Sequence, residues 1–192
     1  MKPGQIVKRF SVKNKEGKKL EVVFRFPRTS DAKEAMHFIN DARDEAEFLG
    51  RRKHETLATE KKFLSEQLKN TKQNNGVFLF VEINGKIVGD ASIMPCSFDT
   101  SPHVGKFGIA LREAFTGLGI GSRLMQKILQ LAKKNTKFRI IESGYFSPNT
   151  RSKKLHKKFG FKQCGKWPTG CQLKDGSYCD HIDVFKQIGK LD

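Results

Sequence analysis

The sequence predicts an α/β (α+β) fold, in which helices flank a mixed, mostly antiparallel central sheet that contains one parallel β-α-β unit. Two observations indicate this architecture. Most apolar segments of strand length follow one another through short turn signals, which is typical of antiparallel hairpins. One strand instead leads through a glycine loop and an amphipathic helix to the next strand, and a helical crossover makes those two strands parallel.

The first seventy residues predict a hairpin followed by two helices. Their expected elements are strands 6–12 and 20–26 around the turn Asn14–Gly17, a helix capped by Thr29–Asp31, a helix from Thr56 to Leu68, and a polar loop from Lys69 to Gly76. The first helix has an apolar face because Ala35, Phe38, Ile39 and Ala42 recur at helical spacing. Residues 47–55 fit no element.

The remainder predicts the centre of the sheet. The expected elements are strands 77–83 and 86–94 joined by Asn84-Gly85, a strand 104–111, a helix from about Gly119, a strand 138–141, a helix from Ser147 or Asn149 to Gly160, and a closing pair 161–164 and 178–185. Asn-Gly readily adopts the type I′ turn that a tight hairpin needs. The strands on either side of it are therefore antiparallel neighbours.

Composition indicates one globular domain over residues 1–192, because 192 residues with 37% hydrophobic content can bury a sizeable core. The first ten residues are too polar for a secretory signal, and no apolar run approaches the roughly 20 residues that span a bilayer. We expect a cytoplasmic protein without a membrane partner. The four cysteines form no C-x-x-C pair, so reduced thiols are expected; a zinc site from Cys164, Cys171, Cys179 and His181 is the alternative.

The net charge of +17 raises nucleic acid as a partner. The basic pairs are spread along the whole chain, however, and no zinc finger, helix-turn-helix or aromatic-rich strand motif accompanies them. We therefore expect no specific nucleic-acid binding, and a basic nucleic-acid-binding module stays the alternative of a different class. A positive surface also attracts the phosphates of a nucleotide-derived cofactor.

The most informative stretch is the glycine loop at Gly117, Gly119 and Gly121. Glycines let the backbone turn sharply, expose successive N–H groups and approach a bulky phosphate. The following helix presents apolar residues on one face from Ser122 to Lys134, and the unpaired N–H groups at its start carry a partial positive charge. This combination predicts a phosphate-binding site at the carboxyl end of strand 104–111.

Spacing separates three phosphate-binding designs. A Walker loop needs a lysine after its last glycine, and Gly121 is followed by Ser122 and Arg123. A dinucleotide fingerprint fits Gly117 and Gly119, but Ser122 replaces its third glycine and five residues separate the strand from the loop. Because two of the three glycines fit, dinucleotide binding is kept as a second alternative function.

The third design is that of the GNAT N-acetyltransferases, whose acyl-coenzyme A loop reads [RQ]-x-x-G-x-[GA]. The segment Thr116–Gly121 resembles this loop, with Thr116 where the family usually has Arg or Gln. Downstream, Asn149–Phe161 resembles the family's N-x-R-A-x-x-L-Y-x-K-x-G-F segment. The resemblance implies the GNAT fold, acetyl-coenzyme A as co-substrate, and direct transfer of the acetyl group to a primary amine of a protein N-terminus, a lysine, a polyamine or a small molecule.

The resemblance also implies cofactor-binding residues. Backbone groups of Ile109 and Leu111 would pair with the pantetheine arm, and Asn149 would contact the cofactor beyond the pyrophosphate. The pyrophosphate would be held by the glycine loop and the first N–H groups of the helix, namely those of Gly117, Leu118, Gly119, Ile120, Gly121 and Ser122. The sequence identifies neither the acceptor nor the oligomeric state.

Catalytic residues follow less directly. His156 stands where the family has its tyrosine acid, so His156 could protonate the leaving thiolate; the alternative is a surface residue on a lysine-rich helix. Glu142 and Glu113 are the carboxylates nearest to the motif in sequence, and each is a candidate base. Glu142 could equally be an ordinary strand-end residue, and Glu113 could only fix the loop before Thr116.

Overall fold

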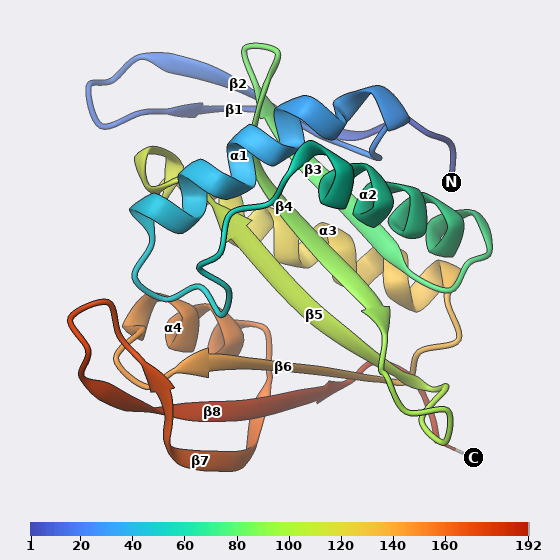
Figure 1. Cartoon of the computed structure of the whole chain (residues 1–192). Coiled ribbons are helices and arrows are strands. Elements are labelled where there is room, and N and C mark those ends of the chain that lie inside the picture. The colour runs from blue at the N-terminus through green and yellow to red at the C-terminus, as the bar shows by residue number, and fades with distance from the viewer. Residues whose placement is uncertain (192) are drawn as a thin grey trace.

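The computed structural model describes residues 1–191, and its strands form one sheet in the order β1-β2-β3-β4-β5-β6-β8-β7 (Figure 1). The strands are β1 (Ile6–Lys13), β2 (Lys19–Arg25), β3 (Val77–Ile83), β4 (Lys86–Pro95), β5 (Val104–Leu111), β6 (Ile140–Phe146), β7 (Lys162–Gln172) and β8 (Tyr178–Gln187). Neighbouring strands are antiparallel except β5 and β6. The predicted fold class, with its single parallel pair, is confirmed.

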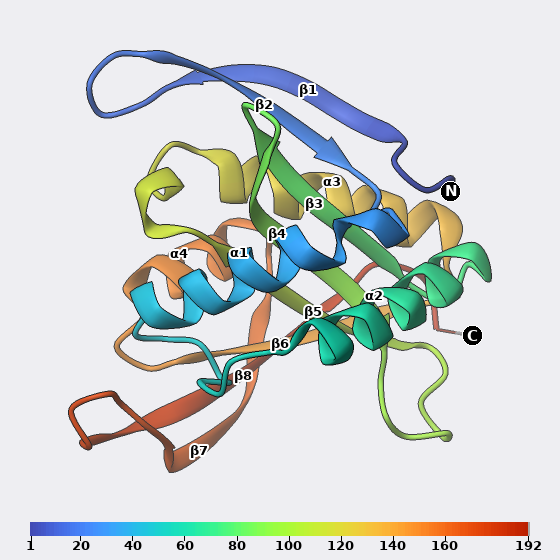
Figure 2. The same cartoon turned by 45° about the horizontal axis from the view of Figure 1, so that its top comes forward.

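Helices cover both faces of this sheet (Figures 1 and 2). They are α1 (Ala32–Glu45), α2 (Leu57–Lys72), α3 (Ile120–Asn135) and α4 (Thr150–Lys158), with short 3-10 turns η1 (Thr29–Asp31) and η2 (Glu113–Phe115). Because side chains alternate along a strand, β3 sends Phe78 and Phe80 toward α1 and α2, and Leu79 into the core that holds α3. Within residues 1–191, the helices lack the length and hydropathy that crossing a membrane requires.

Most predicted elements are present, and the differences are in their ends. Asn84 and Gly85 both have positive φ, 51° and 74°, as the predicted type I′ hairpin turn requires. Helix α2 continues to Lys72, through residues predicted as a loop, because Gln67 and Thr71 are buried on its inner face. Strand β6 continues past residue 141 to Phe146, since β8 pairs with it along its whole length.

The feature that positions the site is the divergence of β5 and β6. These strands pair only between Val104–Lys106 and Ile140–Glu142, although β5 continues to Leu111 and β6 to Phe146. Beyond the paired residues the sheet opens into a V-shaped gap.

Backbone groups of β5 point alternately to its two neighbours. The Phe107 carbonyl accepts from Ser143 on β6, whereas the Arg112 N–H donates to the Val88 carbonyl on β4. By this alternation, the backbone groups of Ile109 and Leu111 face the gap, where no strand pairs with them.

Candidate active site

A pocket with a volume of about 900 Å³ lies in the gap between β5 and β6. It is lined from one side by residues 107–111 of β5 and from the other by residues 143–146 of β6. Its two ends differ. One end reaches the glycine loop and α4, and the other reaches residues 45–50, after α1, together with His181 of β8.

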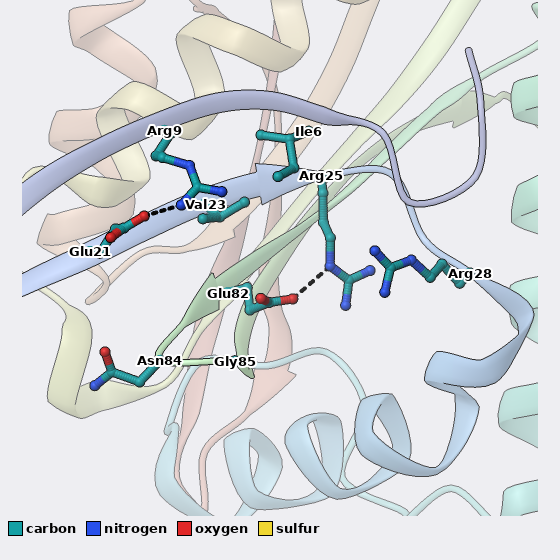
Figure 3. A pocket seen from close by; sticks show the side chains of 9 residues that line it. All are labelled: Ile6, Arg9, Glu21, Val23, Arg25, Arg28, Glu82, Asn84 and Gly85. Atoms are coloured by element: carbon teal, nitrogen blue, oxygen red, sulfur yellow. Dashed lines mark hydrogen bonds and ion pairs between the residues drawn. The ribbon is translucent and has the colours of Figure 1, made fainter.

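A smaller hollow of about 300 Å³ lies on the outer strands, and Arg9, Arg25 and Arg28 are among the residues that line it (Figure 3). Acidic side chains already form ion pairs with two of these three arginines. Arg9 pairs with Glu21, and the buried Arg25 pairs with Glu82 at 2.6 Å and with Asp31 at 2.7 Å. We therefore assign this hollow a structural role, in which Arg25 ties β2 to β3 and to η1.

The glycine loop forms an open cradle at the start of α3. Gly117 and Gly119 have φ of 77° and 76°, a left-handed conformation that favours glycine. A Cβ atom built at either position meets nothing within 4 Å, and at Gly121 it meets only Ile109 Cδ1 at 3.8 Å. The loop is thus not needed for close packing inside the protein, and its inner surface is open to a ligand.

The first turn of α3 has backbone N–H groups that no side chain of residues 1–191 caps. In helices α2 and α4, the side chains of Thr56 and Asn149 accept a backbone N–H of the first turn. Among the described residues no side chain does this for α3, whose first residue follows Gly119. The N–H groups of the first turn and the positive end of the helix dipole therefore both face the pocket, which fits a pyrophosphate.

Basic side chains surround the cradle. Lys154 and Lys158 line the pocket, and Lys158 Nζ lies 3.5 Å from the Ser122 hydroxyl. Thr116, the departure from the family's motif, takes no part in this group. Its hydroxyl donates to the Glu113 carbonyl at 2.8 Å and so serves the loop itself.

Glu113 also stabilises the loop. Arg151 donates to both of its carboxylate oxygens at 3.0 Å, and this interaction lowers the pKa of Glu113. A carboxylate with a lowered pKa is a weak proton acceptor. The geometry therefore favours the alternative in which Glu113 fixes the loop before Thr116.

His156 is buried, with 3% of its surface exposed, so the alternative of a surface residue is wrong. Its ring lies among Phe107, Tyr145 and Phe161, and burial lowers its pKa. Leu155 packs on the core beside it.

Both ring nitrogens of His156 have partners. Nδ1 lies 2.9 Å from the Ser152 carbonyl, and Nε2 lies 2.9 Å from the Ser143 hydroxyl. A carbonyl can only accept, so Nδ1 carries the proton of the neutral ring and Nε2 accepts from Ser143. When the ring is protonated, Ser143 can accept from Nε2 and donate to the Phe107 carbonyl, 3.2 Å away. Because Ser143 lines the pocket, it connects the buried ring to the site.

The predicted site residues separate into three groups. Those that line the pocket are Ile109, Leu111, Gly117, Gly119, Gly121, Ser122, Asn149 and His156. Leu118 and Ile120 pack their side chains on the core, so only their backbone groups could serve the cradle. Glu142 lies on β6 at the last position paired with β5, outside the residues that line the pocket, and the structure therefore gives its predicted role as base no support.

Sequence reasoning missed the other end of the pocket. The unplaced residues 47–55 form part of its wall through Glu47, Phe48, Leu49 and Gly50. Arg43 holds this segment by donating to the Lys53 carbonyl and to the Glu55 carboxylate, and Phe48 packs edge-on against Phe146 with ring centroids 6.1 Å apart. The contact of Phe48 with Phe146 joins segments that are far apart in sequence, and the irregular segment around Phe48 has no periodic signal to detect.

Within residues 1–191 no three His, Cys, Asp or Glu side chains gather as metal ligands, so the structure gives the zinc alternative no support. Cys171 and Cys179 lie opposite each other on β7 and β8, and all four cysteines are free thiols.

Comparison with known proteins agrees with this geometry. The sequence matches the acetyltransferase (GNAT) family over residues 35–161. Among curated proteins, no sequence matches it significantly.

Solved structures of similar fold include a GNAT acetyltransferase from Streptococcus pneumoniae, with 23% identity, a TM-score of 0.79, and coverage of 88% of this chain and 99% of that one. An acetyltransferase from Salmonella typhimurium, solved with its cofactor acetyl-CoA, has 20% identity, a TM-score of 0.76, and coverage of 88% and 95%. A ribosomal-protein-alanine N-acetyltransferase from Brucella melitensis has 24% identity, a TM-score of 0.74, and coverage of 85% and 98%.

The family match spans well over half of the chain and contains both the cradle of α3 and the segment that begins at Asn149. The chain therefore belongs to the acetyltransferase (GNAT) family and is an acyltransferase.

Proposed function

We propose that this protein transfers the acetyl group of acetyl-coenzyme A directly to a primary amine. The observation that carries the proposal is the juxtaposition of two sets of unpaired backbone groups in one pocket. The uncapped first turn of α3 supplies donors for a pyrophosphate, and the gap edge of β5 supplies Ile109 and Leu111 for an extended amide-bearing arm. Coenzyme A carries both chemical groups.

The charge of the pocket supports the same ligand. Lys154 and Lys158 stand beside the cradle, where they can contact phosphate oxygens that the N–H groups do not reach. Asn149 uses its side-chain oxygen to cap α4 by accepting from the Ser152 N–H at 2.9 Å, so its amide N–H groups remain available to a ligand.

The residues at the middle of the pocket have roles in orientation and proton transfer. Acetyl-coenzyme A supplies the activated acyl group as a thioester. Ser143, on the wall of the pocket, can give a proton to a leaving thiolate and recover one from protonated His156, whose lowered pKa makes it a ready donor. Direct transfer requires both substrates at once, and a pocket of about 900 Å³, lined both by the cradle and by residues 45–50, offers each a separate place.

The acceptor is a primary amine whose identity is open among a protein N-terminus, a lysine, a polyamine and a small molecule. The Brucella protein is named for its action on the alanine of a ribosomal protein, and a likeness of 24% identity shows the fold alone. The end of the pocket that would receive the acceptor includes Phe48 and Phe146, so an amine with an apolar neighbouring group fits it.

The proposal is tested by ligand-induced stabilisation followed by an activity screen. Acetyl-coenzyme A at about one hundred times its Kd should raise the melting temperature by roughly 5–10 °C, because it binds only the native state. NADH at the same concentration should produce no comparable shift. The wild-type protein should then release coenzyme A thiol from acetyl-coenzyme A when one amine of a panel is present.

Two results would contradict the proposal. If millimolar acetyl-coenzyme A does not raise the melting temperature, the assignment of this cofactor is wrong. An equal rise with NADH would favour dinucleotide binding. Tight binding of one oligonucleotide sequence at physiological salt would favour the nucleic-acid alternative, because diffuse phosphate contact fades steeply as salt rises.

A further inference from the structure

A second histidine lies at the acceptor end of the pocket and has no place in the chemistry described so far. His181 is on β8, where it pairs with Phe146 of β6 on one side and Trp167 of β7 on the other. Its side chain is 30% exposed and lines the pocket. It is therefore accessible, in contrast to the buried His156.

The ring of His181 is held in one position from several sides. It lies directly over Gly144, where a Cβ atom would come within 2.3 Å of Cε1 and 2.7 Å of Nε2. Only glycine leaves room for the ring there. The rings of Phe146 and Trp167 flank it, with centroids 6.4 and 6.1 Å away. The imidazole thus lies against the wall of the gap, at Gly144, which itself lines the pocket.

A carboxylate orients the ring. His181 Nδ1 lies 3.2 Å from Asp183 Oδ1, so the proton of the neutral ring belongs on Nδ1 and the lone pair on Nε2. Within residues 1–191, Nε2 has no hydrogen-bond partner. A histidine held by a carboxylate, with its second nitrogen available in a pocket, has the arrangement of a general base.

Other titratable groups on the surrounding elements are Glu142 and Tyr145 on β6, Cys164 and Lys166 on β7, Asp180 on β8, and Glu47 in the segment after α1. Lys166 and Asp180 pair with each other at 2.7 Å. Burial raises the pKa of the Cys164 thiol, and the charges of Asp183 and Glu142 add to this shift. The carboxylate of Asp183 attracts an ammonium that enters the pocket beside it. Among these groups Asp183 is the one in contact with the ring.

We propose that His181, oriented by Asp183, is the base that takes a proton from the acceptor ammonium, which enters from the α1–α2 side of the sheet. This inference rests on the proposed function. His181 Nε2 takes one proton from the ammonium, and the resulting amine attacks the thioester carbonyl carbon. The C–N bond forms as the C–S bond breaks. The nitrogen gives its second surplus proton to water. The thiolate takes up one proton through Ser143 from protonated His156, which regains a proton from water, and the His181 imidazolium returns its proton to water.

The test uses the amine that the wild-type protein acetylates and compares His181→Gln with wild type between pH 6 and 10. At pH 7 the kcat/KM for the amine should fall about 100-fold, the usual range for loss of a general base. The deficit should shrink as the pH approaches the pKa of the amine, because a free amine needs no base. Calorimetric affinity for acetyl-coenzyme A should stay unchanged. His37→Gln, on the exposed side of α1, is the matched control and should behave as wild type.

Asp183→Asn supplies an independent variant and should cause a smaller loss with the same pH dependence. If His181→Gln fails to fold, Asp183→Asn still tests whether the His181–Asp183 pair acts as the base. Equal kcat/KM for wild type and the folded variants at every pH would overturn the role of His181 and leave the proposed function intact. A wild-type protein that binds no acetyl-coenzyme A and acetylates no amine would overturn both.

Discussion

The cradle end of the pocket is made by one short stretch of chain, residues 117–122, whereas the acceptor end is assembled from the segment after α1, strand β6 and strand β8. The first binds through backbone N–H groups and so depends on glycine conformation. The second presents side chains, including Phe48 and His181. A pocket built in this way can keep one cofactor while its acceptor changes, because substitutions at the acceptor end leave the cradle unaltered.

The largest effect on the free energy of unfolding is expected at Glu60 of α2, which lies outside the residues that line the pocket. Burial, with a smaller contribution from Glu55, raises the pKa of Glu60 to about 7, from 4.5. Between these values the unfolded chain loses the proton that the native state keeps, so this group lowers stability as pH rises through that window. Glu60→Gln should therefore gain on the order of 2–3 kcal/mol relative to wild type between pH 4 and pH 8.

Urea unfolding at several pH values measures this gain. Glu66→Gln, an exposed position on the same helix, should follow the wild-type curve. Stability curves for Glu60→Gln and wild type that run parallel from pH 4 to 8 would show that Glu60 titrates normally.

Phe48 tests whether the two ends act separately. Phe48→Ala removes an aromatic surface from the acceptor end, which should cost about 2 kcal/mol and lower kcat/KM for the amine about 30-fold. The Kd for coenzyme A should not change. Phe98→Ala, a residue that is 68% exposed and outside the pocket, is the control. A loss of coenzyme A affinity in Phe48→Ala would mean that the ends are coupled.

His156 lies between the two ends and should affect turnover alone. We expect His156→Phe to lower turnover of amine acetylation about 10-fold, which is less than the 100-fold or more that is typical of acid catalysis, because water can also protonate the leaving thiolate. His156→Tyr should recover part of the loss, and affinity for acetyl-coenzyme A should stay nearly constant. Equal turnover of His156→Phe and wild type from pH 6 to 9 would leave His156 as a packing residue.

The smallest effect is expected for Lys158 at the cradle. The lysine side chain is exposed, so Lys158→Ala should raise the Kd for coenzyme A only about 5-fold at low salt, or about 1 kcal/mol. Salt at about 0.5 M should reduce the difference, since screening weakens exposed charges. Lys133→Ala, near the far end of α3, should match wild type. A difference that persists at high salt would point to a contact other than charge.

The same contrast explains what the sequence could predict. The cradle was predictable because its glycines, helix start and strand are contiguous, so spacing alone separates it from other phosphate loops. The hairpin at Asn84-Gly85 was predictable for the same reason. Strand ends were less so: β6 extends to Phe146 because β8 pairs with it, and that partner lies more than thirty residues downstream.

Tertiary placement decided the catalytic candidates. Glu142 and Glu113 were chosen by proximity in sequence, but Glu142 falls outside the pocket and Glu113 is engaged by Arg151. The sequence suggests His181 only as a zinc ligand. Its contact with Asp183 and its position over Gly144 depend on the pairing of β8 with β6, which the sequence does not reveal.

The most direct test of the account compares two glycines, one at each end of the pocket. Neither Gly121 nor Gly50 has a positive φ, and a Cβ at either has no contact closer than 3.8 Å, so both positions can accept a side chain without strain in the free protein. Titration calorimetry with coenzyme A should show a Kd raised at least 100-fold in Gly121→Leu, where the side chain occupies the cradle, and within 3-fold of wild type in Gly50→Leu. Wild-type affinity in Gly121→Leu, or equal weakening in both variants, would contradict the assignment of the cradle.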